Sequence, residues 1–350
     1  MPSPPPSPDA PPRPRRVAWR IVKWTLFAAI LAFVGWRAAA LWEESRSQLA
    51  ETEWRLEWLL LAALAYAAGW LPSVWFWQLL MHRLGGDLRF RDTARAYYCG
   101  HLGKYIPGKA TVLVIRAALM KDRGFRPAPA ALTVAYETLV MMGSGLALGL
   151  AILPLLFRDV DVRELPEWLA WSADGLRWAA ARPFVPALIV GAICLVSLPA
   201  VSRIFTRIAT KMTPRDIIES HGPVRIGAGV VLCGVAAFGA AWALHGLSLG
   251  CTLQALSAEP VRWEDWPMWT GAVALATSAG FAVLVAPGGV GVREGILLEV
   301  LRAQGDVEGS QALLAPIFLR IVWFLTEIVV ACALYYAVRP AARPAARSPR

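Results

Sequence analysis

The sequence predicts an all-α fold, a polytopic transmembrane helix bundle with six full spans and two broken or re-entrant helical segments. Hydrophobic residues occupy 57% of the 350 positions and charged residues only 17%, which leaves too little polar side chain to cover a soluble domain. The apolar residues also gather in runs of about 20, long enough as helices to cross the roughly 30 Å hydrocarbon core of a bilayer. Lysine and arginine gather between these runs, as they do in the cytoplasmic loops of membrane proteins.

The amino-terminal residues 1–16 are rich in proline and arginine, which predicts a disordered cytoplasmic arm. The apolar run after them is too long for the core of a cleavable signal peptide. It is the first of the expected full spans, which lie at about 21–41, 56–80, 128–157, 184–202, 226–250 and 311–338. We assign residues 17–338 to a single transmembrane domain and residues 339–350 to a basic cytoplasmic tail.

Two more apolar segments, at about 96–119 and 268–303, carry charges and are interrupted by Pro-Gly sequences. Proline cannot continue the hydrogen-bond ladder of the preceding helix, and glycine adopts backbone conformations that a side chain resists. The predicted structural breaks are Pro107, Gly108, Pro287, Gly288, Gly289 and Gly291. A new helix is expected to begin near Gly291, with a first turn that favours a carboxylate such as Glu294 or an incoming phosphate.

The charges of the loops predict the orientation of the bundle. Basic loops alternate with acidic ones, which places both termini in the cytoplasm and requires an even number of crossings. The six full spans meet this requirement if each broken segment enters and leaves on one side, the first from the cytoplasm and the second from outside. Their tips then approach the midplane from opposite faces, as in transporters built from inverted repeats. The alternative that either segment crosses fully stays open.

Charged side chains inside apolar segments are the candidate ligands of a lipid head group. Charges at such depth are costly, usually point into the protein and often line a substrate path. These side chains are Arg293, Glu294, Arg116, Arg320, Lys104, Lys109, Glu137 and Glu327. Arginine suits phosphate because its guanidinium stays charged at depth and binds phosphate with two parallel hydrogen bonds.

Two structural interpretations of these charges stay open beside the functional one. The lysines can extend toward the cytoplasmic interface and keep their charge in water. The remaining charges can form purely structural pairs, such as Arg320 with Glu294 or Arg293 with Glu327. We interpret His245 as a packing residue of the bundle, and the tryptophans as anchors at the membrane interfaces.

Several function classes are excluded. The five cysteines are widely spaced and have no histidine at ligand spacing, so we expect no metal site, disulfide framework or cofactor. The net charge of +10 falls mainly in tails and loops, so we expect no nucleic-acid partner. The motifs of serine hydrolases, zinc proteases and P-loop enzymes are absent, so we expect a protein that is not an enzyme.

Three stretches carry a resemblance to a known family: "KYIPGKATVLVIRAALM", "VAPGGVGVREGILL" and "FLRIVWF". They resemble the signature regions of the lysylphosphatidylglycerol synthase transmembrane-region family, bacterial and archaeal membrane proteins related to the membrane half of the multiple peptide resistance factor. The PGGxGxREG block is the most specific, and the resemblance spans roughly residues 20–338. It implies a bundle similar to a lipid flippase, with signature residues Pro107, Gly108, Arg116, Pro287, Gly288, Gly289, Gly291, Arg293, Glu294 and Arg320.

The expected function follows from the charges and the resemblance together. We expect a multi-pass protein of the bacterial cytoplasmic (inner) membrane that binds and flips an anionic or aminoacylated phospholipid, or an isoprenoid-phosphate lipid. The soluble aminoacyltransferase domain of bifunctional relatives is not expected in this chain, so lipid synthesis is not carried over. The alternative is an accessory membrane subunit that stabilises or recruits a lipid-modifying enzyme or glycosyltransferase. An intramembrane transferase that uses glutamates as general bases is less favoured, because no activated nucleophile is visible.

Overall fold

The computed structural model describes residues 55–338, except 87, 106–109, 122, 124, 153–174, 176–177, 180, 183, 213–225, 284–288, 290 and 305–306. Within this part of the chain the only regular elements are helices, which confirms the all-α fold. Five helical stretches in it are long and apolar enough to cross a membrane: Leu56–Arg83, Pro127–Ile152, Val185–Ile208, Ala228–Leu256 and Gly309–Ala337. They match five of the six expected spans, and the sixth, 21–41, lies outside the described residues.

The first of these stretches consists of two helices, α2 (Leu56–Gly69) and α3 (Leu71–Arg83), which are separated at Trp70. Pro72 in the first turn of α3 explains the separation, because proline has no N–H to donate to a carbonyl of the preceding turn. The backbone N–H of Val74 donates to the carbonyl of Trp70, so the two helices continue one another. The indole of Trp70 is thereby placed at a local irregularity in the middle of the span.

The first broken segment is confirmed as an interrupted helix. It comprises α4 (Phe90–His101), a short 3-10 turn η1 (Leu102–Tyr105) and α5 (Ala110–Lys121). The expected break residues Pro107 and Gly108 fall in the interval between η1 and α5, outside the described residues. Lys104 lies in η1, directly before the interval that separates η1 from α5.

The second broken segment is also an interrupted helix. The 3-10 turn η4 (Trp263–Asp265) leads into α12 (Trp266–Ala282), and a new helix, α13 (Val292–Arg302), begins directly after Gly291 as expected. Gly289 and Gly291 have φ angles of +71° and +86°, a region that L side chains rarely adopt. A Cβ on Gly289 would lie 3.1 Å from the Cα of Gly280 in α12. The returning chain therefore lies directly against α12, while Pro287 and Gly288 are outside the described residues.

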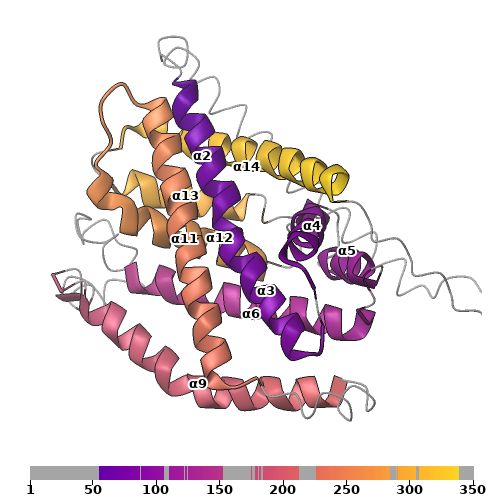
Figure 1. The fold of residues 1–350 in the computed structure, drawn as a ribbon. Coiled ribbons are helices and arrows are strands. Elements are labelled where there is room, and N and C mark those ends of the chain that lie inside the picture. The colour runs from indigo at the N-terminus through magenta and orange to yellow at the C-terminus, as the bar shows by residue number, and fades with distance from the viewer. Residues whose placement is uncertain are drawn as a thin grey trace, which may run out of the picture.

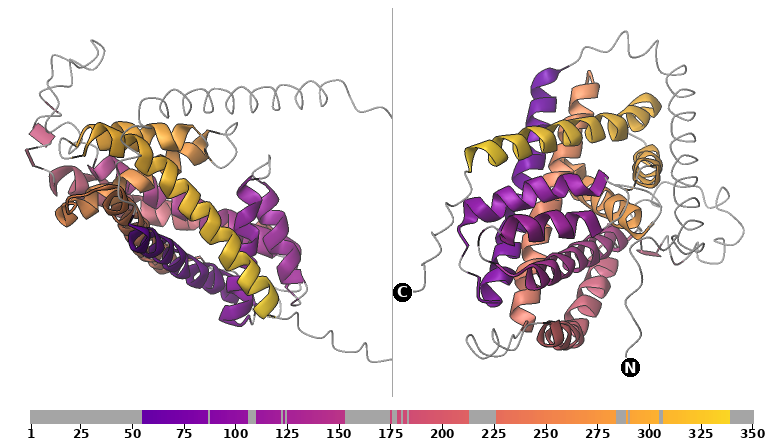
Figure 2. Two further views of the ribbon diagram at one scale, coloured as in Figure 1. Left: turned by 90° about the horizontal axis from the view of Figure 1, so that it is seen from above. Right: turned by 90° about the vertical axis from the view of Figure 1, so that its right-hand side faces the viewer.

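Four long helices complete the described bundle: α6 (Pro127–Ile152), α9 (Phe184–Met212), α11 (Ala228–Leu256) and α14 (Gly309–Ala337). Helix α11 packs along α2 and α3, and α12 packs between α6 and α11. Helix α14 lies across α2 and α11, and α9 covers the outer side of α6 (Figures 1 and 2). The first broken segment packs against α3, α6 and α14, and the second packs against α6, α11 and α14. The side of the membrane from which each segment enters stays a prediction.

Candidate functional site

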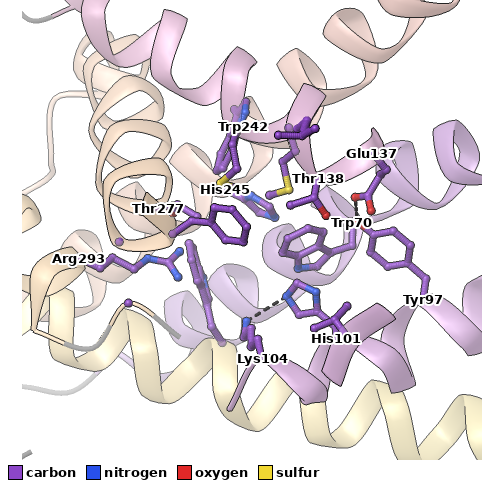
Figure 3. A pocket seen from close by; sticks show the side chains of 18 of the residues that line it. Trp70, Tyr97, His101, Lys104, Glu137, Thr138, Trp242, His245, Thr277 and Arg293 are labelled. Carbon is purple, nitrogen blue, oxygen red and sulfur yellow. Dashed lines mark hydrogen bonds between the residues drawn. The ribbon is translucent and has the colours of Figure 1, made fainter. Parts of the chain in front are cut away.

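A cavity of about 500 Å³ lies where the two broken segments meet. Residues His101 and Lys104 of the first broken segment and Gly289 and Arg293 of the second contribute to its wall, together with side chains from α2, α5, α6, α11, α12 and α14. The polar side chains of the wall point inward from several helices (Figure 3). The structure therefore brings four of the predicted head-group ligands, Lys104, Arg116, Glu137 and Arg293, to one cavity.

Arg293 enters the cavity from the first turn of α13 (Figure 3). Its guanidinium carbon lies 4.4 Å from the centroid of the Trp323 ring, a cation–π contact. Among the described residues, no carboxylate forms an ion pair with Arg293. An aromatic face holds a guanidinium in position without using its N–H donors. Arg293 can therefore still bind an anion with those donors.

Glu294, the next residue, has a structural role. One carboxylate oxygen accepts the backbone N–H of Gly291 at 2.6 Å, which satisfies an otherwise unpaired donor at the start of α13. The other accepts a hydrogen bond from Arg320 of α14. Of the two structural pairings that the sequence left open, Arg320 with Glu294 is thus the one that occurs. Neither residue lines the cavity, and together they fasten the first turn of α13 to α14.

Glu327 pairs with Lys104 and not with Arg293. The ammonium of Lys104 lies 2.5 Å from Oε1 of Glu327, and the hydroxyl of Tyr66 donates to the same oxygen. The Nε2 atom of His101 lies 3.0 Å from the ammonium and 3.6 Å from that oxygen. Only 2% of the Glu327 side chain is exposed. Lys104 therefore points into the protein instead of extending to the cytoplasmic membrane interface. Lys109 lies outside the described residues.

Glu137 and Tyr97 lie on the side of the cavity away from Arg293 (Figure 3), and Glu137 belongs to a second buried pair. Arg116 of α5 donates to Glu137 of α6 at 2.7 Å, and both side chains are 3% exposed. The hydroxyl of Tyr97 donates to the other carboxylate oxygen, also at 2.7 Å. The Arg116 guanidinium carbon also lies 3.6 Å from the centre of the Tyr97 ring. Glu137 and Tyr97 thus hold Arg116, whose charge is balanced before any ligand enters.

The charges on the cavity do not cancel completely. The pairs Lys104–Glu327 and Arg116–Glu137 are each neutral as ion pairs. With the two histidines of the wall counted as neutral, Arg293 supplies a net charge of +1 within the described residues. A group with one negative charge, such as a phosphodiester, complements this wall.

Six Trp, Tyr and Phe side chains of the described part of the chain also line the cavity, and sequence reasoning missed this feature. Trp70, Trp242 and Trp323 line the cavity although we assigned the tryptophans to interfacial belts. Tyr66 stacks on Trp323 with ring centroids 4.2 Å apart. One signal was available, because Tyr66 and Trp70 are four residues apart and so share a helix face. The position of Trp323 between two intramembrane charges of the same helix, Arg320 and Glu327, is another such signal.

His245 is a wall residue as well as a packing residue. It is buried against α2 so closely that a Cβ on Gly69 would lie 2.7 Å from its ring. In the part of the chain that the structure describes, Nε2 of His245, Nε1 of Trp70 and Oγ1 of Thr277 have no hydrogen-bond partner. All three residues line the cavity. They supply polar atoms that a bound head group or water can satisfy.

No group of three or more His, Cys, Asp or Glu side chains that could hold a metal ion occurs in the described ranges.

The chain was also compared with known proteins. A family model described as "Lysylphosphatidylglycerol synthase TM region" matches residues 20–331, which is most of the chain. Neither a curated protein nor a solved structure matches the chain.

Proposed function

This chain belongs to the lysylphosphatidylglycerol synthase transmembrane-region family, and we propose that it binds the phosphate of a membrane lipid in the cavity and moves that lipid between leaflets. The lipid is an anionic or aminoacylated phospholipid, or an isoprenoid phosphate. The protein acts in the bacterial cytoplasmic membrane, with both termini in the cytoplasm. It carries the lipid without chemically changing it.

The observation that carries this proposal is the state of Arg293. A permanent cation faces a cavity inside a membrane protein and is held by an aromatic ring, with no carboxylate paired to it among the described residues. An intramembrane charge in such a setting is costly unless it serves a ligand or a pathway. Phosphate is the natural ligand, because the guanidinium fork matches two of its oxygens. Binding it neutralises both charges and lowers the cost of moving the head group through hydrocarbon.

The rest of the wall suits the apolar part of a lipid. Leu139 of α6 and Phe281 of α12 both line the cavity, and 56% and 40% of their respective surfaces are exposed. Helices α6 and α12 pack against each other. We infer that acyl or isoprenyl chains leave the cavity past these two side chains, so that the head group lies in the cavity while the tails stay in the bilayer.

The alternative function is an accessory subunit that recruits or stabilises a lipid-modifying membrane enzyme. It is favoured by the two pairs Glu294–Arg320 and Arg116–Glu137, which hold helices together and need no ligand. A scaffold of this kind would not depend on Arg293, because that side chain is not paired in the described part of the fold. The two functions therefore differ in what happens when Arg293 is replaced.

The test is reconstitution of the purified chain in liposomes that contain phosphatidylglycerol with a fluorescent acyl chain. Dithionite, which cannot cross the bilayer, quenches the outer-leaflet probe, and transport makes the inner-leaflet probe accessible. We expect transport by the wild type and at least about a tenfold slower rate for Arg293→Ala, since a charge-assisted contact contributes about 1.5–3 kcal/mol.

Arg302→Ala is the matched control, because Arg302 lies on the same helix with 43% of its side chain exposed. It should transport like the wild type. Equal rates for Arg293→Ala and the wild type would reject Arg293 as the phosphate ligand. A wild type that moves no lipid of any head group would favour the accessory function.

A further inference from the structure

We propose that Glu327 is a proton-binding site and that binding of one lipid phosphate is coupled to uptake of one proton by this carboxylate. In this scheme Lys104 leaves Glu327 for the phosphate, and the proton replaces it. The inference rests on the proposed function and adds to it the means by which a pH gradient drives transport.

The first support is the position of Glu327. Its side chain is buried, and Lys104 is the only lysine or arginine that forms an ion pair with it in the described part of the chain. Tyr66 donates to the oxygen that Lys104 contacts, whereas the other oxygen, Oε2, has no hydrogen-bond partner among the described residues. A buried carboxylate with one free oxygen has a place for a proton. Its negative charge is balanced by a single ammonium, that of Lys104.

The second support is the position of Lys104. Its ammonium contacts Glu327, yet the residue also lines the cavity and 22% of its side chain is exposed. It belongs to the short turn η1 at the first break and not to a long helix. The lysine side chain is a flexible four-carbon stem. Lys104 and Arg293 both project toward the cavity (Figure 3). The Lys104 ammonium can therefore reach a phosphate that is bound to Arg293.

The third support is electrostatic. When Lys104 pairs with a phosphate, Glu327 loses its ion-pair partner while it stays buried. An unpaired carboxylate in a low-dielectric site is so unfavourable that the group takes up a proton instead. The charges balance: the phosphodiester brings one negative charge, and one aqueous proton forms an O–H bond on Glu327. The loaded protein has the same net charge as the empty one, so transport of lipid and proton together moves no net charge across the membrane.

Other titratable or charged groups face Glu327 from the elements packed around it. Tyr66 of α2, His101 of α4, and Lys104 and Tyr105 of η1 interact with Glu327 directly, and Arg293 of α13 and Arg320 of α14 interact electrostatically with Lys104 and Tyr105. Tyr66 donates to the carboxylate, and the arginines stay charged. His101 is the competing proton acceptor, since its Nε2 lies 3.0 Å from the Lys104 ammonium. The experiment must therefore distinguish Glu327 from His101.

The experiment is calorimetric titration of the full chain, in nanodiscs of zwitterionic lipid, with short-chain phosphatidylglycerol. Repeating each titration in two buffers that differ in ionisation enthalpy gives the number of protons taken up per lipid bound. We expect about one proton for the wild type where Glu327 is ionised before binding, with affinity rising up to about tenfold for each pH unit of acidification. For Glu327→Gln we expect lipid binding without proton uptake, because the amide mimics the protonated carboxyl.

Glu299→Gln is the control. This carboxylate lies on α13 with 74% of its side chain exposed, and its variant should keep the proton uptake of the wild type. Lys104→Gln provides an independent test if Glu327→Gln does not fold. Without the ammonium, Glu327 is protonated before lipid arrives, so uptake should again be absent.

The results separate this inference from the function on which it rests. Lipid binding by the wild type without proton uptake at any pH tested overturns the proton site and leaves the proposed function intact. Uptake that persists in Glu327→Gln but disappears in His101→Asn also overturns it, because the proton then binds the histidine. A wild type that binds no anionic lipid overturns the proposed function and this inference together.

Discussion

The guanidinium of Arg293 lies over the Trp323 ring, 4.4 Å from its centroid, and joins the first turn of α13 to the middle of α14. Tyr66 stacks on the same ring, with ring centroids 4.2 Å apart. The Trp323 ring therefore orients the guanidinium. The contact of this ring with Tyr66 of α2 holds the ring itself in place. The orientation of the proposed phosphate ligand depends on residues far apart in the sequence.

Replacing Trp323 with leucine should weaken binding of phosphatidylglycerol by roughly three- to tenfold. The cation–π contact contributes about 0.5–2 kcal/mol, and its loss frees Arg293 to adopt other rotamers. Affinity is measured by calorimetric titration of wild type, Trp323→Leu, Arg293→Ala and the double variant. If Trp323 acts through Arg293, the double variant binds no more weakly than Arg293→Ala alone. Additive losses would mean that Trp323 contacts the lipid independently.

Replacing Glu294 with glutamine should lower the free energy of unfolding by about 1–2 kcal/mol. The substitution removes the charge that caps α13 and attracts Arg320, and both side chains are partly exposed, so the cost stays moderate. Thermal unfolding in detergent, followed by circular dichroism, measures the change. Glu299→Gln on the outer face of the same helix should unfold like the wild type. Equal midpoints for the two variants would contradict a capping role for Glu294.

Replacing Glu137 with glutamine should be more damaging, with a loss of about 3–5 kcal/mol, because it leaves the fully buried Arg116 without its carboxylate. The double variant Arg116→Met/Glu137→Leu should recover a large part of that loss, since no buried charge remains. Urea or thermal unfolding of the three proteins in detergent measures this difference. A double variant less stable than Glu137→Gln would show that the pair is not mainly electrostatic.

Replacing Gly289 with alanine should destabilise the second break by about 1–2 kcal/mol and weaken lipid binding. Its φ of +71° disfavours any side chain, and a Cβ would lie 3.1 Å from the backbone of Gly280. Gly295→Ala is the matched control, because a Cβ there meets no atom within 4 Å and helical alanine is favoured over glycine. Unfolding midpoints and phosphatidylglycerol affinity are measured for both variants. Equal behaviour of the two would contradict the constraint at Gly289.

The features predicted from the sequence are those that depend on local chain chemistry. Apolar length identified α6, α11 and α14, because a span must cover the hydrocarbon core whatever its neighbours are. The glycines placed the start of α13 at Gly291, and the carboxylate three residues later was expected at that helix end. The pairing of Arg320 with Glu294 was one of two structural pairings that the sequence left open, since buried charges require partners.

The features that were not predicted depend on contacts between distant segments. Glu327 pairs with a lysine 223 positions away because η1 packs against α14, and no periodicity within either segment specifies that contact. The aromatic wall was missed for a related reason. In a chain that is apolar on every helix face, hydrophobicity does not distinguish a side chain that faces lipid from one that faces a cavity. Trp70 and Trp323 needed the folded arrangement to be assigned.

The two consecutive residues Arg293 and Glu294 join the same neighbouring helix, one through an aromatic ring and the other through an ion pair. Helices α13 and α14 are therefore coupled, and Gly289, just before α13, lies against Gly280 of α12. Any tilt of α14 carries the guanidinium along. A movement of α14 would therefore displace the charge that we propose holds the head group.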